Sequence, residues 1–182
     1  MLIGDDKERK KELRILFSLL FIFVLILLLK QVNNRRLYLA FLIGYVIVVM
    51  FITLGGRSFD AENRIALNPL HEYLTVVKIA KMGLQRGGYR GALNRLWAYR
   101  HVINSFLLNI LLFVPLGYLV PGIVPNVDRV WKIALIGFGF SLFIEVTQLI
   151  THLGWFDTSD LLHNTLGALI GYGIYKKILV IS

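Results

Sequence analysis

The chain has 182 residues, of which 57% are hydrophobic and 17% charged, and its 20 Lys and Arg against 11 Asp and Glu give a net charge of +9. A soluble domain is about 45–50% apolar and about 25% charged, and the chain contains no Cys. These values exclude a soluble enzyme, a disordered tail and a disulfide-held secreted module. They predict an integral membrane protein whose partners are the lipid bilayer and anionic lipid headgroups, with no nucleic acid.

Five apolar segments follow one another along the chain, and each is predicted to be a membrane helix. None shows the two-residue alternation of barrel strands, so the predicted fold is all-α, a polytopic bundle of transmembrane helices. The second segment has 18 residues without an ionisable group, which corresponds to about 27 Å of helix. The five segments are residues 15–29, 37–54, 102–120, 130–150 and 161–175.

The N-terminal region is predicted to differ from the rest of the chain. Residues 1–14 form a charged tail, and residues 15–36 form an additional hydrophobic helix with a basic turn. No small-residue cleavage site follows this helix, so a removable signal peptide is the weaker interpretation. Residues 37–182 form the main membrane domain, in which Pro115 and Gly117 are expected to break the third apolar segment.

A basic loop, residues 55–101, separates the second and third apolar segments. Residues 72–83 follow helical spacing with apolar and basic faces, and Gly87 and Gly88 end that pattern. Two short basic amphipathic helices resting on the anionic lipid surface are expected in this loop. A solvated loop with scattered charge is the alternative.

The predicted orientation of the bundle depends on which loops are counted. If all five segments cross the membrane, the total of basic residues places the N-terminus inside. The short loops give the opposite result, because residues 151–160 contain no Lys or Arg whereas the other short loops are basic. The two counts agree if residues 15–29 lie in the membrane without crossing it, and we favour an outward-facing 151–160 loop.

Polar residues lie within and just after the fourth apolar segment, where burial in lipid is costly and makes each of them a functional hypothesis. Ser141, Glu145 and Gln148 share one helical face. Glu145 is the candidate catalytic acid or base, and Asp157 and Asp160 are its candidate partner carboxylates. Ser141 and Gln148 are expected to bind substrate. The plainer alternative is that the Asp residues cap a helix and the amides only join helices.

Two further polar stripes are expected at the same end of the bundle. His101, Ser105 and Asn109 follow an i, i+4, i+8 spacing, and Asn164 lies four residues after Asp160. Asn109 and Asn164 are therefore predicted to join the binding site. Polar groups from three helices would then meet in one sheltered pocket.

The remaining motifs predict packing rather than chemistry. Gly167 and Gly171 lie four residues apart, a spacing that lets a neighbouring helix approach closely. His152 and His163 flank the carboxylates but lack the tight spacing of metal ligands, so no metal and no cofactor is predicted. A divalent cation at the carboxylate cluster is the alternative.

Taken together, the polar and glycine motifs resemble the VanZ-like family over about residues 100–175. Asn68-Pro69-Leu70 is more loosely similar to an upstream segment of that family. The resemblance implies a four-helix core in a bacterial cytoplasmic membrane, to which residues 15–36 add a helix. The similar stretches are Asn109-Ile-Leu-Leu-Phe-Val-Pro115-Leu-Gly117, Ser141-x-x-x-Glu145-x-x-Gln148 and Asp157-x-x-Asp160-x-x-x-Asn164-x-x-Gly167-x-x-x-Gly171.

The resemblance also implies a function at the cell envelope. The family's namesake lowers susceptibility to teicoplanin-type glycopeptide antibiotics, so the first hypothesis is an envelope protein of that kind, with a glycopeptide or a lipid-linked cell-wall precursor as ligand. The second is a membrane-embedded enzyme that acts on a lipid or lipid-linked precursor through Glu145, Asp157 and Asp160. The third is a non-catalytic membrane scaffold whose polar network serves only helix packing.

Overall fold

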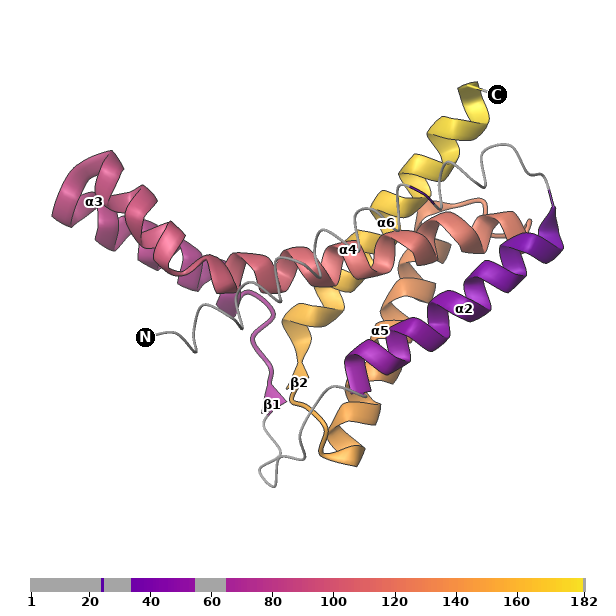
Figure 1. The fold of residues 1–182 in the computed structure, drawn as a ribbon, viewed down its shortest axis with the longest axis horizontal. Helices are drawn as coiled ribbons and strands as arrows, with labels where there is room; N and C mark the ends of the chain where they lie inside the picture. Colours follow the sequence, from indigo (N-terminus) through magenta and orange to yellow (C-terminus); the bar gives the residue numbers. More distant parts are fainter. Residues whose placement is uncertain (1–23, 25–33, 55–64, 182) are drawn as a thin grey trace.

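The structure, a computed structural model, describes Val24, residues 34–54 and residues 65–181 (Figure 1). The predicted tail and most of the predicted first helix lie outside these residues. The described chain is mainly helical, so the all-α prediction is confirmed apart from one short pair of strands. The elements are α2 (Arg35–Leu54), β1 (Ile65–Ala66), α3 (His71–Ala98), α4 (Arg100–Ile123), α5 (Val130–Thr151), β2 (Phe156–Asp157) and α6 (Thr158–Ile181).

Three of the described helices are long and apolar enough to cross a membrane. They are α2, the Val102–Ile123 part of α4, and α5. Their large exposed side chains are apolar, as in Ile47 of α2 and Ile150 of α5, which are 63% and 72% exposed. The fifth predicted segment, residues 161–175, lies in α6, which is not among these three helices and which carries more polar residues.

The core of the bundle is the contact between α4 and α6, with α5 packed on α6 and α2 packed on α4 (Figure 1). Phe113 of α4 and Ala168 of α6 are fully buried there. A Cβ atom added at Gly167 or Gly171 would overlap backbone carbonyl oxygens of α4. The helices approach this closely because no side chain separates their backbones, so the predicted packing role of this glycine pair is confirmed.

Helix α4 runs without interruption through Pro115 and Gly117, so the predicted break in the third apolar segment is wrong. Proline lacks the N–H that would bond to the preceding turn, and this normally weakens a helix. Here the neighbouring Val114 and Leu116 are both only 4% exposed, and a Cβ on Gly117 would overlap the carbonyl oxygen of Ala168. Dense packing against α6 therefore keeps α4 helical across the proline.

Helix α3 is a hairpin of two helical arms that projects from the bundle (Figure 1). Gly87 and Gly88 have non-helical backbone angles, and Gly88 has a positive φ of 58° that favours glycine. The returning arm brings Gly91 and Ala92 so close to Gly83 that a Cβ there would overlap their backbone. The prediction of two helices separated by Gly87 and Gly88 is confirmed, and their position on an anionic lipid surface stays a prediction.

A parallel pair of two-residue strands joins two connections that are far apart in the chain. Ile65 and Ala66 of β1 pair with Phe156 and Asp157 of β2, and Thr158 Oγ1 donates a hydrogen bond of 3.1 Å to the carbonyl oxygen of Ala66. This pairing brings the segment before α3 to the start of α6. The first turns of both helices therefore lie side by side.

Candidate functional site

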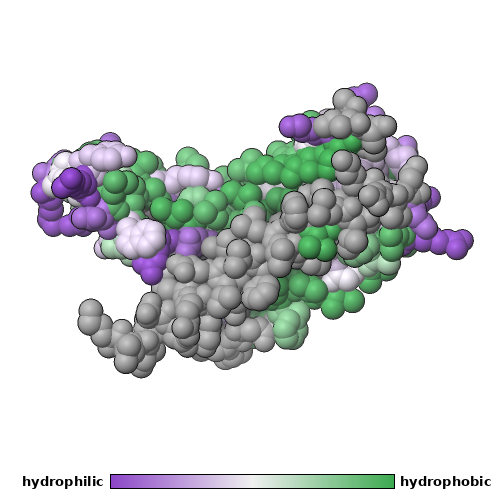
Figure 2. Space-filling view, turned by 45° about the horizontal axis from the view of Figure 1, so that its top comes forward, coloured by the Kyte–Doolittle hydropathy of each residue, from purple (hydrophilic) through white to green (hydrophobic). Residues whose placement is uncertain are grey.

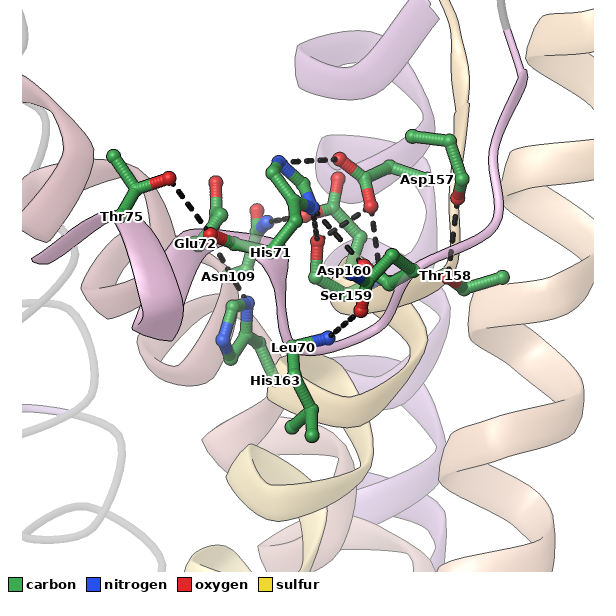
Figure 3. A network of polar contacts seen from close by, with 12 residues as sticks. Leu70, His71, Glu72, Thr75, Asn109, Asp157, Thr158, Ser159, Asp160 and His163 are labelled. Atoms are coloured by element: carbon green, nitrogen blue, oxygen red, sulfur yellow. Dashed lines mark hydrogen bonds and ion pairs between the residues drawn. The ribbon is translucent and has the colours of Figure 1, made fainter. Parts of the chain in front are cut away.

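Polar side chains meet where α3 and α6 begin, beside the first half of α4 (Figure 3). The strand pair and the α4–α6 contact bring together residues that are up to 92 positions apart in the chain. Two of these side chains are imidazoles and four are carboxylates or amides, so the cluster contains both acid and base groups. Its members are His71, Glu72, Asn109, Asp157, Ser159, Asp160 and His163.

Asn68 fixes the start of α3 and with it the position of His71. The side-chain Oδ1 of Asn68 accepts a hydrogen bond of 3.0 Å from the N–H of Leu70. The backbone carbonyl oxygen of Asn68 lies 3.1 Å from Nδ1 of His71. On the other side of the ring, His71 Nε2 lies 3.9 Å from Asp157 Oδ2. The two side chains are 41% and 22% exposed, so this imidazole–carboxylate pair can be reached from outside the bundle.

Asp157 also caps the start of α6. Its Oδ1 accepts a hydrogen bond of 2.8 Å from the N–H of Ser159 and a second one from the Ser159 hydroxyl, while the hydroxyl oxygen lies 3.4 Å from His71 Nδ1. The N–H of Asp157 donates a 2.8 Å hydrogen bond to Glu145 Oε2. Glu145, which is 2% exposed, therefore reaches the cluster through the backbone of Asp157.

A second imidazole–carboxylate pair is buried behind the first. His163 is fully buried, and its Nδ1 lies 3.6 Å from Glu72 Oε2. The rings of Tyr73 and Phe106 flank it, with centroids 5.3 and 5.4 Å away. Within the described residues, neither nitrogen of His163 has a hydrogen-bond partner, and neither has Glu72 Oε2. A buried polar atom without a hydrogen bond is costly, so the polar atoms of this pair are well placed to bond to a proton or a ligand.

Burial raises the pKa of Glu72, and the nearby charge of Asp157 raises it further, whereas His71 opposes the shift. The folded protein therefore holds this proton more tightly than the unfolded chain. The binding of this proton by Glu72 contributes to the free energy of unfolding. That contribution is complete at pH values below the ordinary carboxyl pKa of 4.5, and it is lost as the pH rises through the raised pKa of Glu72.

We expect the melting temperature of the wild type to fall over that pH range relative to the melting temperature of Glu72→Gln, which has no carboxyl group to titrate. Thermal unfolding of both proteins in detergent at a series of pH values measures the difference. Parallel curves for the two proteins would show that Glu72 is not buried with a raised pKa.

Asn109 connects α4 to the start of α6. Its Nδ2 donates a hydrogen bond of 2.5 Å to Asp160 Oδ1, and Asp160 lies in the first turn of α6, where a carboxylate favours the positive end of the helix dipole. Asn109→Asp replaces the donor with a like charge and is expected to lower the free energy of unfolding by about 1–3 kcal/mol. Asn94→Asp on the exposed surface of α3 is the matched control, and an equal loss in both would contradict this contact.

The structure brings only some of the predicted site residues into the cluster. The cluster contains Asp157, Asp160 and Asn109, and Glu145 borders it.

The other predicted site residues lie between helices outside the cluster. Asn164 Nδ2 donates a 2.8 Å hydrogen bond to Ser141 Oγ between α5 and α6. Gln148 Nε2 donates a 3.1 Å hydrogen bond to the carbonyl oxygen of Thr53 at the end of α2. These bonds join helices, as the packing alternative expects. The side chain of His101 lies outside the described part of the chain.

The sequence interpretation missed the contribution of α3. His71 and Glu72 were not candidates, Ser159 was not considered, and His163 was considered only as a metal ligand. The available signal was the position of His71 and Glu72 directly after the Asn68-Pro69-Leu70 segment, at the start of a predicted helix. Among the described residues, no three His, Asp or Glu side chains are arranged to hold a metal ion.

Comparison with known proteins adds one match. A family model described as VanZ/LLP1 matches residues 37–181, which include every member of the cluster. No curated protein and no solved structure matches the chain.

Proposed function

The chain belongs to the VanZ/LLP1 family, and from this premise we propose that it is a membrane-embedded enzyme that acts on a lipid or lipid-linked cell-wall precursor. We further propose that it is a multi-pass protein of a bacterial cytoplasmic membrane. In this proposal α2, α4, α5 and α6 form a four-helix core, and residues 15–36 add a hydrophobic helix. The bilayer itself, its anionic lipids and the precursor would be its partners.

The observation that carries the proposal is the pairing of two successive residues of α3 with two residues at the start of α6. His71 faces Asp157, and Glu72 faces His163. One pair is accessible and the other is buried, and burial raises the pKa of Glu72 in the second pair. Acid–base catalysis uses groups in such unequal environments, because one must take up a proton while the other gives one away.

The two pairs have different roles in this proposal. With Nδ1 of His71 donating its proton to the carbonyl oxygen of Asn68, Nε2 is the atom that accepts a proton from the substrate or from water. The Asp157 carboxylate stabilises the resulting imidazolium. Glu72, whose pKa is raised by burial, gives its own proton to the leaving group, and the proton taken up by His71 then restores Glu72 to its protonated form. Asn109 and Asp160 hold α4 against α6 beside these groups.

Reconstitution tests the enzymatic proposal. The purified protein is placed in lipid nanodiscs that contain extracted envelope lipids and lipid-linked precursors, and the mixture is followed by mass spectrometry. We expect one species to be consumed and one to accumulate with the wild type, and neither change with His71→Asn. Unchanged mixtures with folded wild-type protein in the nanodiscs would overturn the proposal.

The family match favours a cellular consequence that can be tested separately. We propose that the activity lowers susceptibility to teicoplanin-type glycopeptides at the cell envelope. Expression in a susceptible host is expected to raise the inhibitory concentration of teicoplanin and to leave that of vancomycin largely unchanged. The absence of a selective change would remove this consequence and leave the enzymatic proposal to its own test.

A further inference from the structure

The α3 hairpin carries large apolar side chains on its outer surface. On the returning arm, Tyr89, Leu93 and Trp97 lie four residues apart, so they form one stripe along the helix. They are 74%, 48% and 71% exposed. Water is a poor environment for such a continuous stripe, and in soluble proteins exposed apolar patches of this kind mark binding surfaces.

The two arms pack against each other through small residues, and many of the large apolar residues, though not Ile79, are left outside. Gly83 meets Gly91 and Ala92 at the contact, whereas Leu74 and Leu84 of the first arm are 59% and 51% exposed. A hairpin that packed in water would place its leucines between the arms. The arrangement seen here instead offers apolar side chains to a surrounding apolar medium.

Basic residues accompany these apolar side chains. The hairpin has five Lys and Arg and one acidic residue, Glu72, which is turned into the candidate site. Figure 2 shows hydrophilic and hydrophobic side chains next to each other at this end of the molecule. Long basic side chains beside exposed apolar and aromatic ones are typical of helices that lie at the surface of an anionic bilayer. The basic residues are Lys78, Lys81, Arg86, Arg90 and Arg95.

We propose that the α3 hairpin lies in the headgroup layer of an anionic lipid bilayer, with Tyr89, Leu93 and Trp97 directed at the acyl boundary and Arg86 and Arg90 at lipid phosphates. A second copy of the chain is a poorer occupant, because two hairpins of the same positive charge repel each other. This inference does not depend on the enzymatic proposal. It places the base of the hairpin, where α3 enters the site, at the level of lipid headgroups.

The absence of Cys from the chain allows the position of the hairpin to be measured with single labels. Spin labels are attached to Leu93→Cys and Trp97→Cys, with Asn94→Cys on the same arm as the matched control. In nanodiscs that contain phosphatidylglycerol, we expect the first two labels to be relaxed more by oxygen than by a water-soluble nickel complex, and the control label to show the reverse. Equal access of the nickel complex to all three labels would overturn the proposal, as would spin–spin coupling between copies.

Native mass spectrometry tests the charge part of the proposal. Removal of one basic residue is expected to lower the amount of copurifying phosphatidylglycerol about fivefold, since each charge near an anionic surface contributes about that factor. The test compares Arg86→Gln and Arg90→Gln with Arg86→Lys and Arg90→Lys, which keep the positive charge at the same exposed positions. Equal lipid retention in the variants that remove the charge and in those that keep it would overturn it. A loss of the fivefold effect at high salt is expected as well.

Discussion

Asp157→Asn is expected to lower turnover by about 100-fold or more while leaving the amount of folded protein in the membrane unchanged. Asparagine keeps the Oδ1 atom that accepts the hydrogen bond from the N–H of Ser159, so the start of α6 retains its cap. It loses the negative charge that faces His71 Nε2 at 3.9 Å. The imidazolium formed during proton transfer then lacks its stabilising partner. Turnover is measured in nanodiscs, and abundance is measured by quantitative immunoblotting of membranes.

Asp128→Asn is the matched control for this prediction. Asp128 lies in the loop between α4 and α5, at the opposite end of the bundle, where it forms an exposed ion pair of 2.7 Å with Lys132. An exposed pair contributes little to stability, so this variant is expected to behave as the wild type. If Asp157→Asn lost abundance and function together, the cluster would serve packing, and the scaffold hypothesis would hold in place of the enzymatic one.

Alanine at Gly117, Gly167 or Gly171 is expected to lower the free energy of unfolding by about 1–3 kcal/mol. A Cβ atom at each position would overlap a backbone carbonyl oxygen of the facing helix. A backbone cannot move aside as a side chain can, so α4 and α6 must separate and lose contacts around Phe113 and Ala168. Thermal unfolding in detergent, followed by circular dichroism, measures the effect.

Gly139→Ala and Gly173→Ala are the controls for the helix contact. Both residues lie in helices, and a Cβ at either would meet nothing within 4 Å. Alanine favours a helix over glycine by about 1 kcal/mol, so these two variants are expected to equal or exceed the stability of the wild type. A similar loss at all five positions would show that the α4–α6 contact is looser than in the structure.

The sequence was sufficient to predict the helices whose positions depend on local composition. The predicted segments 37–54 and 130–150 agree with α2 and α5 to within two residues, because unbroken apolar runs determine where a membrane helix begins and ends. The same is true of the turn at Gly87 and Gly88, since those residues interrupt a clear helical pattern. The predicted break at Pro115 was wrong because tertiary packing, which has no local signal, overrides the proline.

The site was only half predictable, for a related reason. Asp157, Asp160 and Asn109 stand out because polar groups are costly beside apolar segments. His71 and Glu72 do not, since they lie in a polar loop where such residues are ordinary. Their role follows from the pairing of two short strands about 90 residues apart, and strands of two residues leave no readable pattern in a sequence.

The most direct test of the proposed acid–base site is the profile of envelope lipids and lipid-linked precursors in cells that make wild-type protein or Asp157→Asn at equal membrane abundance. The wild type is expected to change the pool of at least one such species relative to cells without the protein, and Asp157→Asn to restore the profile of those cells. A profile that Asp157→Asn changes as strongly as the wild type would contradict a catalytic role for the His71–Asp157 pair.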